Sequence, residues 1–582
     1  MVLAAVVLVV SACASALAEP LARVDGLESA PLREGLIAAI GQADGPTDDR
    51  WRARERAENA AERARAHLRS QGYYAARVDA RVDDQGQALV RVRVGERFTF
   101  ETVAVSFDQP DGAPAPGEAV SDAVNVSRGD PVTASSVIEA AARLTAALHE
   151  NGFPEASEAD YAVTVDHADG EATARFSSDT GPFVRFGDPR FAGGLADLRE
   201  DYIDRLAPYE LGDPASRTAL NTFASRLAAL DGVAVADARL SPQGAEDADG
   251  RRPVDVRAEP APKHRLSGAV SWSTDEGFGA RGAWTRRNLF GGAERATLSG
   301  QAAQLERSVS AEYFAPHWAA FNQDLALGAQ LAQERTDAFD QDVFRLDSEL
   351  SRRFSRKWSA SLGAGLQVGE IIDAEGERFL TTFTAPSGVV YDGRDDVLDP
   401  REGVYIDIEA MPGWSTGDND VRFVRAVSAV RYYAPLADRF TLALRARSGA
   451  VFGASAQSIP ADLRFYAGGG GSVRGYAFQA LSPLRAAPGT QAEEPFGGRS
   501  LVEGSAELRW RRSQTLGFAA FVDAGAAGED LQPDLDAVRY GAGLGVRYYP
   551  GFGPIRLDIA TPIDPRGRDD AFQVYISIGQ AF

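Results

Sequence analysis

FYAGGGGSVRGYAF, residues 465–478, is the stretch that decides how the rest of the chain is interpreted. Four successive glycines fit neither a helix nor a regular strand, because such a run loses much backbone entropy and packs little. The stretch therefore predicts a loop, with Arg474 as its one charged residue. Since the flanking segments alternate like half-apolar strands, we expect the loop to push this guanidinium into a polar interior. The alternative is a flexible glycine loop with a solvated arginine.

From Arg265 onward, apolar residues alternate with small polar ones. The first such segment divides into two faces, one with Leu266, Gly268, Val270 and Trp272 and the other with Ser267, Ala269, Ser271 and Ser273. Alternation with period two indicates β-strands, and its repetition through the rest of the chain predicts a transmembrane antiparallel β-barrel. The length allows about sixteen strands, and bacterial barrels have even numbers. A soluble β-sandwich, which also alternates, is the alternative.

The closing segment has the clearest alternation. One face of it carries Phe572, Val574, Ile576, Ile578 and Phe582. An alternating strand with a terminal aromatic residue is similar to the carboxy-terminal signal of bacterial outer-membrane proteins. We therefore expect this strand to close the barrel.

Residues 1–18, MVLAAVVLVVSACASALA, form the one long apolar run, and they end in an A-x-A cleavage pattern. This pattern predicts a secretory signal peptide. The alternative is a lipoprotein signal, because Val10, Ser11 and Ala12 precede Cys13, the sole cysteine. If cleavage follows Ala18, the mature chain has no thiol chemistry. No later apolar run reaches the roughly eighteen residues of a spanning helix, so a barrel is the expected way into a membrane.

Composition and motifs argue against several function classes. The net charge of -22 excludes a basic nucleic-acid footprint. The five histidines show no metal-ligand spacing. Gly277, Gly279 and Gly282 match a dinucleotide fingerprint, but no helix is expected to follow them, and no hydrolase or metalloprotease motif occurs. We expect no enzyme, no cofactor and no metal.

Before the barrel, the sequence repeats with a period of 80 residues. The repeated glycines are Gly72, Gly152 and Gly232, and each is expected to follow a helix and precede two strands. This predicts three α+β repeats, at 19–97, 98–181 and 182–263, ahead of a barrel at 264–582. The alternative is a run of unrelated α+β domains.

The loop motif Val473, Arg474, Gly475 and Tyr476 resembles the VRGY/VRGF signature of the outer-membrane insertase superfamily. These bacterial surface antigens carry periplasmic POTRA domains before a sixteen-stranded barrel, and the three repeats look like POTRA modules. In that family the signature loop folds back into the barrel lumen. Its arginine there meets an aspartate on a nearby strand.

A matching strand motif is present at 517–525, GFAAFVDAG. It resembles the family's aromatic-x-Asp-x-Gly pattern, which makes Phe521, Asp523 and Gly525 the expected surroundings of Arg474. On the preceding strand Glu507 faces the same way, so it is a second candidate partner. Arg556 and Asp558, further on, are expected to form a lumenal ion pair.

Three repeats favour the TamA-like branch of this superfamily. The resemblance then implies an outer-membrane location, a TamB-like periplasm-spanning partner and outer-membrane protein clients such as autotransporters. It also implies strand addition at a weak seam between the first and last strands, formed by Leu266, Ser267, Val270, Ser271, Val574, Ile576, Ile578 and Phe582. The alternatives are a role in phospholipid transport to the outer membrane, a protein secretion pore and a passive channel.

Overall fold

The computed structural model describes residues 19–582 except 44, 46–48, 196, 274–276, 487–492, 551–552 and 579. The predicted signal peptide lies outside the described residues. The chain divides into two compact units. The first contains the chain up to Arg190 with Pro208–Ala224 and Ala238–Val256, and the second contains Phe191–Ala207, Ser225–Asp237 and Arg257–Phe582. Within the described part of the chain, no helix is both long enough and apolar enough to cross a membrane.

The first repeat is a three-stranded sheet with two helices, and its strand order is β1-β3-β2. Its elements are β1 (Arg23–Asp25), α1 (Ala30–Ile40), α2 (Arg50–Ser70), β2 (Arg77–Val82) and β3 (Ala88–Arg93). β1 runs parallel to β3, and β2 runs antiparallel to it. Small buried residues on one face of α2, among them Ala57, Ala60 and Ala64, let the helix lie close to the sheet.

The second and third repeats have the same element order and the sheet orders β4-β6-β5 and β7-β9-β8. The second consists of β4 (Thr99–Asp108), α3 (Glu118–Asp122), α4 (Ala134–Glu150), β5 (Asp160–Asp166) and β6 (Glu171–Asp179). The third consists of β7 (Arg185–Leu195), α5 (Glu200–Asp204), α6 (Arg217–Ala228), β8 (Val233–Leu240) and β9 (Arg251–Pro260).

The repeated glycines differ in their backbone conformation. Gly72 and Gly152 follow α2 and α4 with φ of 91° and 93°, the left-handed region that favours glycine after a helix. Gly232 does not have a positive φ, because α6 already ends at Ala228. The expectation of a glycine cap in every repeat is therefore wrong for the third.

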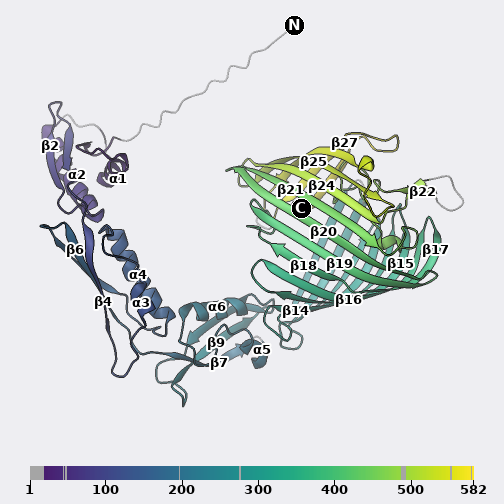
Figure 1. Cartoon of the computed structure of the whole chain (residues 1–582), viewed down its shortest axis with the longest axis horizontal. Helices are drawn as coiled ribbons and strands as arrows, with labels where there is room; N and C mark the ends of the chain where they lie inside the picture. Colours follow the sequence, from purple (N-terminus) through teal and green to yellow (C-terminus); the bar gives the residue numbers. More distant parts are fainter. Residues whose placement is uncertain are drawn as a thin grey trace, which may run out of the picture. The chain divides into compact units, whose positions relative to one another are not determined.

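The rest of the chain forms a closed antiparallel barrel, seen in Figure 1 as one curved sheet coloured from teal to yellow. Its described strand segments are β10 (His264–Ser273), β11 (Gly277–Arg287), β12 (Arg295–Ala303), β13 (Glu306–Ala315), β14 (Gln323–Arg335), β15 (Asp340–Arg353), β16 (Trp358–Asp373), β17 (Gly376–Thr384), β18 (Ser387–Asp392), β19 (Gly403–Gly417), β20 (Val421–Ala437), β21 (Phe440–Phe452), β24 (Ser500–Arg511), β25 (Leu516–Gly528), β26 (Arg539–Tyr548), β27 (Ile555–Pro562) and β28 (Gln573–Ile578). The glycines of the dinucleotide-like pattern, Gly277, Gly279 and Gly282, lie within β11.

These seventeen described segments fill sixteen strand positions, because β17 and β18 are two parts of one interrupted strand. β16 pairs with both of them, and so does β19. Ala385 and Pro386 separate the two parts, and a proline has no N–H to donate to the ladder. The carbonyl of Pro386 still accepts a 2.7 Å hydrogen bond from the Gly363 N–H. The expected sixteen-strand barrel is thus observed, with one interruption.

Residues 453–499, between β21 and β24, contain the glycine-rich loop. This segment carries the short hairpin β22 (Leu484–Ala486) and β23 (Glu493–Pro495). Its apolar residues pack in a buried cluster with residues of the barrel wall, among them Val451 and Leu501. The wall strands alternate as expected, with large apolar residues such as Leu362 exposed and polar residues such as Glu507 buried. The loop therefore lies against the polar inner face of the barrel.

Candidate functional site

The loop motif is enclosed by the barrel. Val473 and Tyr476 are completely buried, and Arg474 is 2% exposed. Gly475 has a φ of 100°, and a Cβ there would lie 2.8 Å from the carbonyl carbon of Thr561. Both the backbone conformation and the close approach to β27 therefore require glycine. The motif is held in place by a fixed backbone as well as by its arginine.

Arg474 binds Asp523 through three hydrogen bonds. Its backbone N–H and its Nε donate to Oδ2 at 3.1 and 2.7 Å, and its Nη2 donates to Oδ1 at 3.0 Å. Asp523 faces inward on β25, since its neighbour Val522 is 46% exposed on the outer face. The Ser505 hydroxyl also donates to Asp523, at 2.5 Å. This forked pairing fixes the guanidinium plane as well as its charge.

Two further carboxylates complete the surroundings of Arg474. Its Nη1 donates to Glu507 Oε2 and to Asp558 Oδ2, both at 3.0 Å. The Phe521 ring centroid lies 3.3 Å from the guanidinium carbon, which is a cation–π contact. Burial by itself would lower the pKa of Arg474, but the carboxylates around it raise that pKa. The loop arginine is therefore charged in the folded protein.

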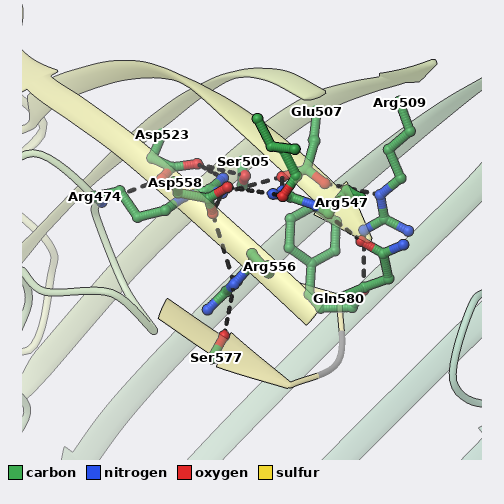
Figure 2. A network of polar contacts seen from close by, with 12 residues as sticks. Arg474, Ser505, Glu507, Arg509, Asp523, Arg547, Arg556, Asp558, Ser577 and Gln580 are labelled. Carbon is green, nitrogen blue, oxygen red and sulfur yellow. Dashed lines mark hydrogen bonds and ion pairs between the residues drawn. The ribbon is translucent and has the colours of Figure 1, made fainter. Parts of the chain in front are cut away.

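Three more arginines surround these carboxylates (Figure 2). Arg509 donates from Nε to Glu507 at 2.8 Å, and Arg547 binds both Asp558 and Glu507. Arg556 lies 3.6 Å from Asp558. We call this set the lumenal charge cluster; it consists of Arg474, Arg509, Arg547, Arg556, Glu507, Asp523 and Asp558. Its four arginines and three carboxylates leave an excess of one positive charge.

The structure brings together the predicted residues Arg474, Asp523, Glu507 and Phe521. Gly525 is also adjacent, because a Cβ there would lie 2.9 Å from Val473 Cγ2. Sequence reasoning assigned Asp558 only to an ion pair with Arg556 and missed its bond to Arg474. The contact between Arg474 and Asp558 depends on how the loop crosses β27, and no local sequence pattern predicts that path.

Other loop anchors were also missed. Arg464, 2% exposed, lies 2.7 Å from Asp373, and both side chains are fully enclosed. Arg445 on β21 donates to the carbonyls of Gly471 and Ser472, each at 2.8 Å. Their sequence signal is weak, since each is a single arginine without a motif. The loop is thus held at several points along its length.

The first and last barrel strands meet at a sparsely paired junction, which we call the seam. Among the described residues, β10 and β28 pair at Trp272 with Ile576 and at Ser273 with Tyr575. By contrast, β10 pairs with β11 along its whole length, His264–Ser273. Most of the seam edge of β10 therefore has no described strand partner.

The predicted seam residues lie on these two strands, with one exception. Leu266 and Val270 are 81% and 74% exposed on the outer face, next to the exposed Ser267, and Ile576 is exposed on β28. Val574 is half-buried and pairs with Ile559. Ser271 and Ile578 occupy register positions opposite Gly279 and Ile555.

Phe582 is the exception, because the prediction that it continues the closing strand on the same face as Ile576 is wrong. β28 ends at Ile578. The Phe582 ring lies 5.5 Å from the guanidinium carbons of Arg445 and Arg509, and its carbonyl accepts a bond from Arg509 at 3.2 Å. Gln580 likewise contacts Arg547 (Figure 2). Gln580 and Phe582 thus contact arginines of the lumenal charge cluster, which offer both cation–π contacts and hydrogen-bond donors.

The described residues contain no group of three or more His, Cys, Asp or Glu side chains that could hold a metal ion. The carboxylates of the lumenal charge cluster are bonded to arginines instead. Their arrangement suits the fixing of a loop through its arginine rather than the binding of a metal ion.

Residues 288–582, half of the chain, match the family model described as "Omp85 superfamily domain". The chain belongs to the Omp85 superfamily. As a member, it is an outer-membrane β-barrel protein, with its POTRA-type repeats in the periplasm.

Curated relatives are named outer membrane protein assembly factor BamA. The one from Nitratidesulfovibrio vulgaris is 26% identical over 54% of this chain and 42% of its own length. The one from Neorickettsia risticii is 23% identical over 53% of this chain and 44% of its own length. The matches thus span less than half of these relatives. The TamA-like assignment stays a prediction.

A solved structure shares the fold. The crystal structure of BamA from Haemophilus ducreyi lacking POTRA domains 1–3 has a TM-score of 0.69 and 16% identity. The match covers 82% of this chain and 99% of that one. At this identity the likeness establishes the architecture of POTRA domain and barrel, and nothing about clients.

Proposed function

We propose that this chain is an outer-membrane assembly factor that inserts β-barrel clients, autotransporters among them, by adding client strands at the seam. The observation that carries the proposal is that β10 and β28 pair at only two positions among the described residues. The BamA assembly factors among its relatives support the general activity. The TamB-like partner belongs to the same proposal and rests on the resemblance alone.

The driving force is backbone pairing. β10 presents N–H and C=O groups along residues 264–271, and each unsatisfied backbone group in lipid costs several kcal/mol. A client strand that pairs with β10 provides hydrogen-bond partners for the backbone N–H and C=O groups of both strands. Folding of the client supplies the free energy, so the step requires no nucleotide. The periplasmic repeats contribute further edge strands, β1 and β2 in the first sheet, which suit an extended client chain.

Photo-crosslinking in cells tests this proposal. We would place a photo-reactive phenylalanine at Leu266 or Val270 while a client autotransporter is being assembled. The matched control is Leu362 on β16, which is 62% exposed on the outer face but is paired on both sides, with Leu350 on β15 and Ser387 on β18. We expect client adducts at the seam positions and few at Leu362.

Equal adducts at all three positions, or none at the seam while probes on the repeats react, would exclude strand addition. A silent seam with altered outer-membrane lipid composition would instead favour lipid transport. Steady conductance without an effect on client assembly would favour a channel.

A further inference from the structure

A pocket of 550 Å³ lies on the inner face of the first three barrel strands. Its volume is within the roughly 300–1,000 Å³ that small-ligand sites occupy. β10, β11 and β12 each contribute one arginine to its lining, Arg265, Arg281 and Arg295, and we call it the arginine pocket. Three cations around one pocket contrast with the chain as a whole, whose net charge is -22.

Strand alternation places the arginine pocket in the lumen. Leu266 is exposed on the outer face, so its neighbour Arg265 faces inward, and the register sets Thr285 and then Thr297 beside Arg265 on the next two strands. β10 follows the periplasmic repeats directly, and Arg265 is its second residue. The pocket therefore lies toward the periplasmic end of the barrel.

The positive charge of the pocket is not neutralised by the protein. Among the described residues, none of its three arginines forms an ion pair with a carboxylate. Arg281 donates to Ser299 Oγ at 3.5 Å, and the guanidinium carbon of Arg295 lies 4.0 Å from the centroid of the Phe314 ring. Arg265 and Arg281 are exposed, so their guanidinium groups are accessible to a ligand in the lumen.

The rest of the lining also suits an anion, and a phosphate group in particular. Arginines bind phosphate oxygens through paired, charge-assisted hydrogen bonds, and the hydroxyls of Ser267, Thr285 and Thr297 supply further donors. The pocket contains one carboxylate, Asp231, which Arg287 binds at 3.0 Å. A cleft lined mainly by one sign of charge also raises the local concentration of ions of the opposite sign.

The strand edge beside the pocket favours a phosphate group that belongs to a lipid. β10 pairs with β28 only at Trp272 and Ser273 among the described residues, so its edge beside Arg265 has no described strand partner. On the outer face of the same strand, Leu266 and Val270 are exposed. A phospholipid carries its phosphate next to apolar chains, and it therefore complements a strand edge that is cationic inside and apolar outside.

We infer that the arginine pocket binds the phosphate group of a phospholipid whose acyl chains stay in the membrane beside β10. The inference goes beyond the proposed function, because it gives the barrel a ligand other than a client strand and requires no client. A soluble phosphate ester carries the same chemistry, so the test must separate the two sources.

Native mass spectrometry of the full chain in detergent micelles measures the binding directly. We would titrate phosphatidylglycerol, diacylglycerol with the same acyl chains, and glycerol phosphate, and obtain an apparent Kd for each. Diacylglycerol lacks the phosphate, and glycerol phosphate lacks the chains. We expect phosphatidylglycerol to bind at least about tenfold more tightly than either of the others, since it alone has both parts.

Glutamine in place of all three arginines of the pocket removes its positive charge. The matched control changes the net charge equally at three exposed arginines in turns outside the pocket, Arg356→Gln, Arg439→Gln and Arg512→Gln. We expect the pocket variant to bind phosphatidylglycerol at least about tenfold more weakly and the control to bind it as the parent protein does. Lysine at the three pocket positions should restore part of the affinity, because lysine keeps the charge but not the forked geometry.

Three results would overturn the inference. Diacylglycerol that binds as tightly as phosphatidylglycerol would show that the chains alone are recognised. Glycerol phosphate that binds as tightly would assign the pocket to a soluble phosphate ester. An equal loss of affinity in the pocket variant and the control, or no loss in either, would exclude the pocket as the site. If the triple variant does not insert as a heat-modifiable barrel, the three single glutamine variants decide by the same titration, with a fall of about twofold or more expected for each.

Discussion

β24 pairs with β25 along Ser500–Arg511, whereas β10 pairs with β28 only at Trp272 and Ser273 among the described residues. β24 and β25 also carry Glu507 and Asp523, the buried partners of Arg474. Breaking buried ion pairs leaves charges without partners, whereas opening a ladder of two described residue pairs frees only a few backbone groups. The difference indicates a barrel that is firmly paired where it holds its loop and sparsely paired at the seam, where we propose that a client strand enters.

The largest expected effect on stability and client assembly comes from Arg474→Ala, which removes the loop arginine held by β24 and β25. It leaves three buried carboxylates without their shared cation, and we expect a loss of about 3–5 kcal/mol in folding stability. Client assembly should fall sharply while the barrel still inserts and stays heat-modifiable on a gel. Asp523→Ala should behave alike, and combining the two should add little.

Arg447→Ala is the control for Arg474→Ala. Arg447 also lies on β21, but its side chain is 36% exposed and its carboxylate partner, Glu503, is 3.5 Å away. We expect it to change client assembly little. Full client assembly with Arg474→Ala would remove the loop from the mechanism.

An intermediate effect is expected from Gly541→Ala, a change on β26 outside both motifs. A Cβ there would lie 1.9 Å from the Arg474 carbonyl oxygen, so the loop must move away from the wall. Such overpacking typically costs about 1–3 kcal/mol. We expect reduced client assembly and faster cleavage of residues 453–499 by added protease.

Gly282→Ala gives the matched comparison on the seam side of the barrel. A Cβ at Gly282 on β11 would meet nothing within 4 Å, so this variant should match the parent protein. Equal protease sensitivity of the two variants would show that the loop is not held against β26.

The smallest effect is expected from Phe521→Leu, which removes the cation–π contact and keeps the ion pairs. The cost should be about 1–2 kcal/mol, because the ring lies against a desolvated guanidinium. The temperature at which the barrel loses its fast gel migration should fall, with client assembly largely kept. Ala519→Gly, on the same inward face of β25 and also buried, removes a side chain without touching Arg474 and serves as the control.

Much of the surroundings of Arg474 could be predicted, because the sequence patterns that indicate them are local. Period-two alternation places Phe521 and Asp523 on the inner face of one strand, and the loop motif names Arg474. The third carboxylate, Asp558, was assigned to another pair, since its contact with Arg474 depends on the path of the loop across β27. Phe582 was misplaced for a related reason: alternation continues past Ile578 in the sequence, but buried arginines draw the last residues away from the strand.

The comparison is tested most directly by disulfide locks on the two junctions. Trp272→Cys with Ile576→Cys joins the seam, and Ala506→Cys with Val522→Cys joins β24 to β25; both are directly opposed pairs in register. Client assembly would be measured with each lock oxidised and then reduced. The account predicts that the oxidised seam lock stops assembly, that reduction restores it, and that the lock between β24 and β25 has no effect. Normal assembly with an oxidised seam lock would contradict it.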